Sequence, residues 1–597
     1  MKRYAILLYL IFSVYVNISA HLSDMGLYFW GKYGGVDINC NDISAQNRSS
    51  SSCQINHNTR GKEYSPLFIP SASDSIMNVR INLIFIQKDN GTGNFQEDST
   101  EHQALFDDIM TILNNKTFQL VYPGADCFAG AESDIIGDIR IRFVDHRYYV
   151  KKSSLWNNNL FFSRNNLCPE ANNWYLAGVD DSLNNIFVDT LKGINIYYTE
   201  DSILYNRFWE ISDLTDTTEY GNSNTKGACS MFPNYQNLYA SSRIHMPCLY
   251  SKYWWMKNIV PQLNEFNHPS WENQVRSWLV GGHAASLLHE IGHSFYLLHP
   301  TNDRYRPYRS YPMDDCWNSI MQPSGSSPRD FLPPNEIGLM YISTMTTNLQ
   351  QFIPSNTYLG TKLLQTTVTL PRMRMYYSLL IGASGNVTMP CDITFSPHGY
   401  IEVQNGGELS INGAVLQSVQ NSWGGITVQS GGTLKLSDVI VGDFNITIKS
   451  GGCLIINDDL TIQGDHRITI EDGGYLCIAS DASVNLQNEF SVIIISPNAH
   501  LGCPSCSENC ITSYSDLSHI GDGRFEVYEE IDFVQNITIT SDYLVMGDTV
   551  YAGYDVTSTK PVGDVKVEDG GSLIIQANEA FLTKDVEVKL GGELKIQ

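Results

Sequence analysis

At residues 286–300 the chain reads SLLHEIGHSFYLLHP, with three histidines and a glutamate in a fixed pattern. His289 and His293 are four residues apart. On a helix that turns about 100° per residue, they project from one face about one turn apart. Two imidazoles in this arrangement can hold one divalent metal ion. Glu290 lies roughly 100° round the helix from the first histidine, where its carboxylate can act as general base on a metal-activated water.

His299 follows His293 by six residues. A continuing helix would carry it to another face and about 9 Å further along the axis. His299 can therefore join the other two histidines only if the helix ends between His293 and His299. Three histidine ligands would leave a fourth position open, which distinguishes a catalytic zinc site from a structural one.

The residues around this motif predict a sheet with helices. The run 79–87 (VRINLIFIQ) is typical of a strand, as are 139–144 and 194–198, and 243–249 is extended. Helical spacing marks 101–113 and 271–298, and a helix beginning with prolines is expected over 331–347. The sequence therefore predicts an α+β domain over residues 73–352.

Downstream of the motif stands Ser319-Ile320-Met321. HEIGHSFYLLH resembles the metzincin zinc peptidases at both histidine spacings, and Ser319-Ile320-Met321 is similar to their Met-turn. The resemblance implies one catalytic Zn²⁺ held by His289, His293 and His299, with Glu290 as general base. It also implies that Met321 supports the site from beneath without binding the metal.

Two residues depart from the family pattern. Tyr296 stands where the family has glycine, at the point where the chain must leave the helix. A tyrosine with positive φ costs about 1–2 kcal/mol. Pro323 stands where astacin-like members carry a zinc-binding tyrosine, so no tyrosine ligand is implied.

An alternative ligand set follows from a resemblance to the gluzincin peptidases, in which a downstream carboxylate replaces the third histidine. Glu336 is the candidate for that role.

Beyond residue 353 the composition changes and a repeat begins. Pairs of glycines followed by x-Leu recur at intervals of about 20 residues, between short segments that alternate apolar and polar residues. The pairs are Gly406-Gly407, Gly431-Gly432, Gly451-Gly452, Gly473-Gly474, Gly570-Gly571 and Gly591-Gly592. This pattern predicts an all-β, parallel β-helix or solenoid over 353–502. Residues 503–597 are expected to hold a cysteine-containing insertion and further β repeats. For Cys503, Cys506 and Cys510 we favour disulfides over a metal site.

The beginning of the chain indicates its compartment. Lys2 and Arg3 precede an apolar run, which predicts a signal peptide over 1–20. Residues 21–72 are interpreted as an N-terminal extension or a pro-segment. The thirteen cysteines favour disulfides outside the cytoplasm. A net charge of -25 argues against a nucleic-acid partner.

Together these features predict a multidomain protein that is secreted or held at the cell surface. Its first expected function is zinc-dependent endopeptidase activity on protein or peptide substrates. The solenoid is expected to contact a cell surface or glycan. The alternative is an adhesin or a glycan- or protein-binding protein whose peptidase domain is inactive. The sequence leaves structural calcium sites open.

Overall fold

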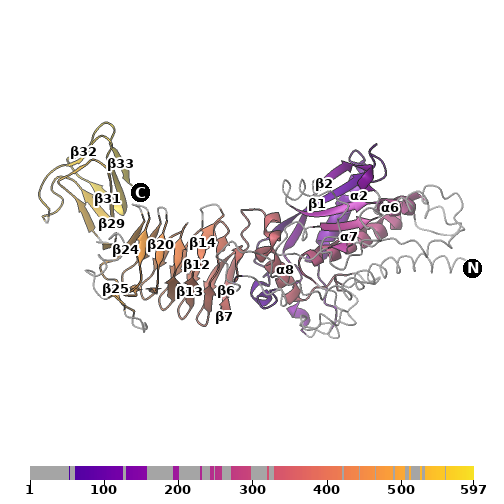
Figure 1. The fold of residues 1–597 in the computed structure, drawn as a ribbon, viewed down its shortest axis with the longest axis horizontal. Helices are drawn as coiled ribbons and strands as arrows, with labels where there is room; N and C mark the ends of the chain where they lie inside the picture. Colours follow the sequence, from indigo (N-terminus) through magenta and orange to yellow (C-terminus); the bar gives the residue numbers. More distant parts are fainter. Residues whose placement is uncertain are drawn as a thin grey trace, which may run out of the picture. The chain divides into compact units, whose positions relative to one another are not determined.

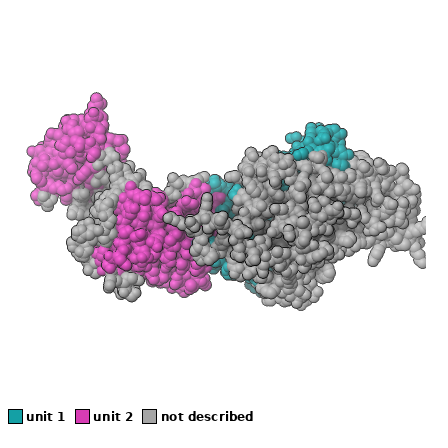
Figure 2. All heavy atoms as spheres, viewed as in Figure 1, with its two compact units in different colours: residues 1–360 teal, residues 361–597 magenta. Residues whose placement is uncertain are grey.

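The computed structural model describes residues 53, 61–124, 130–156, 193–200, 229–230, 243–247, 249–258, 270–297, 319–321, 329–419, 423–442, 444–463, 466–487, 491–503, 510–511, 525–527, 531–558 and 560–596. These residues belong to two compact units, 1–360 and 361–597 (Figure 2). The predicted signal peptide, most of the expected extension over 21–72, and His299 lie outside the described residues.

A five-stranded sheet with the order β2-β1-β3-β5-β4 forms the centre of the first unit (Figure 1). Its strands are β1 (Met77–Gln87), β2 (Ile141–Lys151), β3 (Ile194–Thr199), β4 (Cys229–Ser230) and β5 (Arg243–Pro247). All pairs are parallel except β4 with β5. Strand β1 is buried at every residue from Ile81 to Gln87. Its two polar side chains there, Asn82 and Gln87, donate hydrogen bonds to Asn195 Oδ1 and Phe95 O. This burial is typical of a strand covered on both faces.

Helices complete the first unit. They are α2 (Thr100–Phe118), α3 (Ser153–Trp156), α6 (Leu249–Asn258), α7 (Arg276–Ser294) and α8 (Pro334–Thr346), with short turns of other helix types at Ser65–Phe68, Glu132–Asp134, Trp271–Val275 and Asn348–Phe352. The predicted helix over 271–298 begins as a π-helical turn and ends four residues early, at Ser294. The helices α2 and α7 pack against each other, and Arg276 at the start of α7 pairs with Asp108 of α2.

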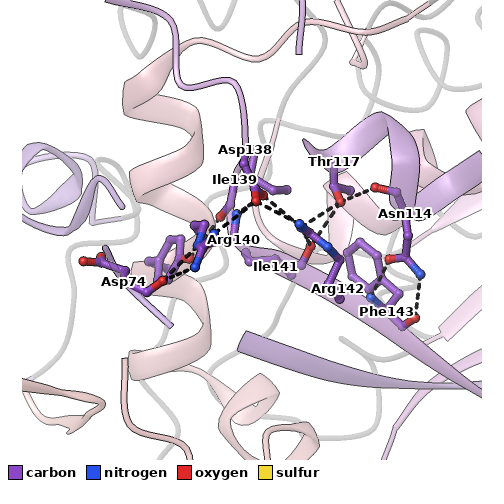
Figure 3. A network of polar contacts seen from close by, with 10 residues as sticks. Asp74, Asn114, Thr117, Asp138, Ile139, Arg140, Ile141, Arg142 and Phe143 are labelled. Carbon is purple, nitrogen blue, oxygen red and sulfur yellow. Dashed lines mark hydrogen bonds and ion pairs between the residues drawn. The ribbon is translucent and has the colours of Figure 1, made fainter. Parts of the chain in front are cut away.

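A polar network fixes the start of β2 (Figure 3). Arg142 donates to both carboxylate oxygens of Asp138 at 2.9 Å, and Arg140 Nε donates to the carbonyl of Asp74 at 2.9 Å. The Asn114 side chain on α2 exchanges two hydrogen bonds with the backbone of Phe143. The hydroxyl of Tyr341 on α8 donates to Ile139 O at 3.0 Å. This network therefore joins β2, α2 and α8, and α8 in turn supports the end of α7, as described below.

The second unit contains three parallel sheets whose strands alternate along the chain, so each coil gives one strand to each sheet. The seven-stranded sheet holds β7 (Thr367–Thr369), β10 (Asn386–Met389), β13 (Glu408–Asn412), β16 (Thr433–Ser437), β19 (Cys453–Ile456), β22 (Tyr475–Ile478) and β25 (His500–Leu501). The six-stranded sheet holds β8 (Met373–Met375), β11 (Ile393–Phe395), β14 (Val415–Ser418), β17 (Val439–Val441), β20 (Leu460–Ile462) and β23 (Val484–Leu486). The eight-stranded sheet holds β6 (Gly360–Leu364), β9 (Tyr377–Ile381), β12 (Ile401–Val403), β15 (Ile426–Val428), β18 (Ile446–Ile448), β21 (Arg467–Ile470), β24 (Val492–Ile495) and β26 (Phe525–Val527). The predicted parallel solenoid is confirmed.

Register explains why the glycine pairs repeat. Leu409, Leu434, Leu454 and Leu476 align on successive strands, and all four are fully buried. The first glycine of each pair has positive φ, between 72° and 92°, which favours glycine. At the second glycine the neighbouring coil approaches closely, since a Cβ on Gly432 would lie 2.6 Å from Val403 O.

The coils continue past Gly474, where the glycine period lapses in the sequence. The Gly473 amide donates to Asn498 O at 3.0 Å, just as Gly451 donates to Gly473 O. Asn498-Ala499 thus occupies the place of a glycine pair, and the coil persists without the motif. The Cys477–Cys510 disulfide confirms the disulfide interpretation for Cys510, and Cys53 and Cys391 are also disulfide-bonded.

After the solenoid strands come two further parallel sheets. One holds β27 (Ile531–Val534), β29 (Asp542–Ala552), β31 (Ser572–Leu582) and β33 (Glu593–Ile596), and the other holds β28 (Ile537–Ile539), β30 (Val565–Val567) and β32 (Val586–Val588). Val550, Val565, Leu573 and Ile575 are fully buried in their shared core. Among the helices that the structure describes, none is long and apolar enough to cross a bilayer.

Candidate metal centre

The two histidines of the motif lie side by side on α7. Their ring centroids are 4.8 Å apart and the ring planes meet at 86°. His289 and His293 are each only 6% exposed, and Glu290 between them is 8% exposed. The four-residue spacing therefore produces the shared helix face that the sequence predicts. It does so in a largely water-excluded part of the unit.

Backbone carbonyls fix the protonation of both rings. Nδ1 of His289 donates to Ile320 O at 3.0 Å, and Nδ1 of His293 donates to Leu297 O at 2.8 Å. Because a carbonyl can only accept, each neutral ring carries its hydrogen on Nδ1 and keeps a lone pair on Nε2. Metal-binding histidines are held in this way by their second nitrogen. The two side chains thus have the tautomer that a Zn²⁺ ligand needs.

The chain leaves α7 through a Schellman motif. Tyr296 N donates to His293 O at 3.0 Å and Leu297 N donates to Gly292 O at 3.1 Å, while Tyr296 takes the left-handed conformation with φ 69°. Ser343 of α8 supports this end by donating its hydroxyl to Phe295 O at 2.9 Å. The helix therefore ends between His293 and His299, as a third histidine ligand requires.

Tyr296 has a backbone conformation that is usually found at glycine, and burial of its side chain offsets the strain. Only 5% of Tyr296 is exposed. Left-handed backbone costs about 1–2 kcal/mol at a residue other than glycine. Loss of a buried aromatic side chain costs about 3–5 kcal/mol. Packing thus outweighs strain, and the turn forms without glycine.

We expect Tyr296→Gly to destabilise the first unit by about 2 kcal/mol, although it relieves backbone strain. His398 is the matched control, because it has φ 66° but is exposed. His398→Gly relieves similar strain without loss of burial and should stabilise its own unit by about 1 kcal/mol. Urea unfolding of both variants measures these changes. A gain of stability in Tyr296→Gly would show that packing does not hold the turn.

Met321 lies directly against the metal-motif helix. It is fully buried, and a Cβ added to Gly292 would lie 2.4 Å from its sulfur. The preceding residues are fixed by a parallel bridge between Ser319 and Phe331 and by a hydrogen bond from Ile320 N to Phe331 O at 2.9 Å. Met321 thus packs under the turn that joins His289 and His293. The same segment supplies the carbonyl that orients His289.

The structure also reveals a buried cation that no motif indicates. Arg329 is 8% exposed and has φ 47°. Burial lowers the pKa of its guanidinium to about 10, and attraction to Glu290 opposes that shift. Arg329 therefore remains charged at neutral pH. The sequence around it offered no spacing or repeat by which it could be recognised.

The structure does not bring Glu336 to the two histidines. Glu336 lies in the first turn of α8. Within the part of the chain that the structure describes, no group of three or more His, Cys, Asp or Glu side chains is arranged to hold a metal ion. Since His289, His293 and Glu336 are all described, the alternative ligand set is disfavoured. The predicted third ligand, His299, lies outside the described residues and stays a prediction.

His283 is a packed residue of α7 rather than part of the metal motif. Its Nε2 lies 3.0 Å from the hydroxyl of Tyr198 on β3. Burial, reinforced by the nearby Lys252 of α6, lowers the pKa of His283 to about 3. Burial also raises the pKa of Tyr198, so the hydroxyl stays protonated and donates to a neutral imidazole.

This pair predicts loss of stability in acid. In the unfolded chain His283 would take up a proton below about pH 6.5, whereas in the folded unit it stays neutral down to about pH 3. The contribution of His283 to the free energy of unfolding is complete above pH 6.5. It decreases as the pH falls, by on the order of 3 kcal/mol at pH 4. Urea midpoints at several pH values check this, with His283→Gln as control. If the urea midpoint changes equally with pH in the wild-type protein and in His283→Gln between pH 6.5 and 4, the prediction is wrong.

Comparisons with known proteins assign no family. No family model matches the chain, and no curated protein matches it. Among solved structures, a match is found to the TibC-catalysed, hyper-glycosylated fragment of TibA, at 14% identity over 40% of this chain and 89% of that one, with a TM-score of 0.12. A TM-score this low does not define a shared architecture.

Proposed function

We propose that the first unit is a zinc-dependent endopeptidase. The observation that carries this proposal is the pair of buried imidazoles whose Nδ1 hydrogens are committed to Ile320 O and Leu297 O. The Nε2 atoms, on one helix face beside the buried carboxylate of Glu290, would be the nitrogens that bind the metal. His299, beyond the Schellman turn, would complete the set of three nitrogens.

The chain's own residues have distinct tasks in this proposal. Zn²⁺, when bound, would supply a Lewis acid that polarises the peptide carbonyl and acidifies water. Glu290 takes a proton from the attacking water and passes it to the nitrogen of the leaving amine. The carbonyls of Ile320 and Leu297 hold the imidazoles in place, and Met321 closes the underside of the helix against solvent.

Dependence of proteolysis on metal tests the proposal. The full chain, freed of metal by a chelator, is incubated with a peptide library and then with added Zn²⁺. We expect cleavage to be absent without metal and to return at one zinc per chain. Profiling of the cut sites would then give the substrate preference. Equal cleavage by the metal-free and zinc-loaded protein would contradict the proposed mechanism.

A row of aromatic side chains near the C-terminus supports a second candidate function, which is binding to a glycan or a surface. Phe533, Tyr551 and Phe581 align on β27, β29 and β31, with centroids 5.7 and 4.9 Å apart and nearly parallel rings. Phe581 is 43% exposed. Exposed aromatic rings favour stacking with partners. Binding of the full chain to a glycan array, compared with Phe581→Ala, tests this function separately from proteolysis.

Secretion is part of the same proposal. The Cys477–Cys510 disulfide is typical of an oxidising compartment. Export of the full chain from a secretory host, compared with a variant lacking residues 1–20, tests the predicted signal peptide.

A further inference from the structure

Strand β2 forms one edge of the five-stranded sheet, beside β1 (Figure 1). Met77 N donates to Arg140 O across this pair, so residues at even positions of β2 direct their backbone groups towards β1. In a parallel ladder, the residues between them direct both N–H and C=O to the outside of the sheet. Asn114 of α2 occupies these outward groups at Phe143. Within the described part of the chain, four further residues have outward backbone groups without a hydrogen bond: Asp145, Arg147, Tyr149 and Lys151.

This open edge is straight and held in place before any partner arrives. Natural proteins protect an edge strand with a proline, a bulge or a short length. Strand β2 has 11 residues, contains no proline, and pairs with β1 residue for residue. On one face, α2 fixes its side chains, since Arg147 donates to Asp107 at 2.6 Å and Gln103 donates to the Tyr149 hydroxyl at 2.7 Å. The edge is therefore prepared to accept another strand.

The charges along the edge favour one register with a second copy of the chain. In antiparallel pairing about a two-fold axis at Tyr148, Asp145 of each copy faces Lys151 of the other. Arg147 then faces the ring of Tyr149, a favourable contact for a guanidinium. A shift of the register in one direction places Arg147 opposite Lys151, and a shift in the other places Arg147 opposite its own copy. Like charges in facing positions destabilise a strand pair, so the register at Tyr148 is preferred.

We propose that the β2 edge joins two copies of this chain into one continuous sheet. About eight backbone hydrogen bonds, two for each facing pair of outward residues, close the open edge of both copies. The two-fold axis makes the interface self-complementary, since each copy supplies both the acidic and the basic end. The interface uses no residue of the candidate metal centre, so this inference does not depend on the peptidase function.

Charge reversal tests both the pairing and the identity of the partner. In sedimentation of the full chain, we expect single chains at about 1 µM and pairs at about 100 µM, because an edge pairing buries a small area. Asp145→Lys and Lys151→Glu each place like charges opposite each other twice, and each should weaken association about 10- to 100-fold. An equal mixture of the two variants restores both attractive pairs and should associate as the wild-type protein does, which two misfolded variants could not do.

Two results of this experiment would overturn the proposal. If the wild-type chain stays single at about 100 µM, the edge is left to a strand from another protein. If the variants associate as strongly alone as when they are mixed, the contact between copies lies on another surface.

A cysteine at the two-fold axis tests the register. Tyr148 faces its own copy in a pair that is not hydrogen-bonded, with Cα atoms about 4.5 Å apart, which is within the range of a disulfide. Tyr148→Cys should therefore form a covalent dimer on oxidation, measured on a non-reducing gel. His146→Cys is the matched control, because His146 is exposed on the same face but lies about 13 Å along the strand from its own copy. Equally rapid cross-linking of both variants would contradict this register.

Discussion

Replacing Glu290 by alanine is expected to abolish peptide cleavage while the protein retains its zinc. Glu290 lies between two histidines whose Nδ1 atoms are bound to carbonyls, so the histidines do not depend on Glu290 for orientation. Removal of a general base lowers the rate by about 10²- to 10⁴-fold. We expect kcat/KM to fall by at least this factor and zinc content to stay at one per chain, measured by elemental analysis.

Two further variants sharpen this result. Glu290→Gln keeps the shape of the side chain but cannot accept a proton as a carboxylate does, so it should be as inactive as Glu290→Ala. Glu272 lies at the start of the same helical region but is exposed, and Glu272→Gln should retain full activity. Normal cleavage by Glu290→Gln would exclude Glu290 as the base. An inactive wild-type protein that still binds glycans would favour the adhesin alternative.

The sequence predicted those parts of the site that depend on local geometry. A spacing of four residues is enough to place His289 and His293 on one face, because the helix repeat is fixed. The need for an exit before His299 was also predictable. The form of that exit was not, because the burial that offsets strain at Tyr296 arises from tertiary packing. Spacing and propensity contain no information about such packing.

The groups that surround the site residues could not be predicted from the sequence. The carbonyl of Ile320 and the guanidinium of Arg329 lie 21 and 30 residues beyond His299, the last residue of the motif. Among the described residues, the pairing of Ser319 with Phe331 joins these two segments, and Ile320 O accepts from His289 of α7. Met321 was found because its motif resembles a known turn, whereas a lone arginine has no such pattern.

In the second unit, the solenoid could be predicted because a glycine pair recurs at the turn of successive coils. A positive φ favours glycine at one position of the turn, and the aligned leucines mark the side of each strand that is buried. At Asn498-Ala499, inside the predicted solenoid over 353–502, the coil continues without the glycine pair. Backbone pairing between coils, rather than the motif, is what defines this architecture.

Replacing His293 by alanine is expected to eliminate zinc binding. The change removes one of three proposed ligands, so affinity should fall by more than the roughly 10- to 100-fold that loss of an outer partner costs. It also removes the bond to Leu297 O, which should lower the stability of the metal-free protein by only about 1 kcal/mol. Zinc affinity and the Tm of the metal-free protein separate the two effects.

Matched variants identify the whole ligand set. His283→Ala removes another buried histidine from the same helix and should leave zinc affinity unchanged. If His299 is the third ligand, His299→Ala should lose zinc as His293→Ala does, whereas Glu336→Ala should retain it. The opposite result for the last two would restore the carboxylate alternative. Retention of zinc by both His289→Ala and His293→Ala would place the metal elsewhere, because the helix face could then supply no more than one ligand in either variant.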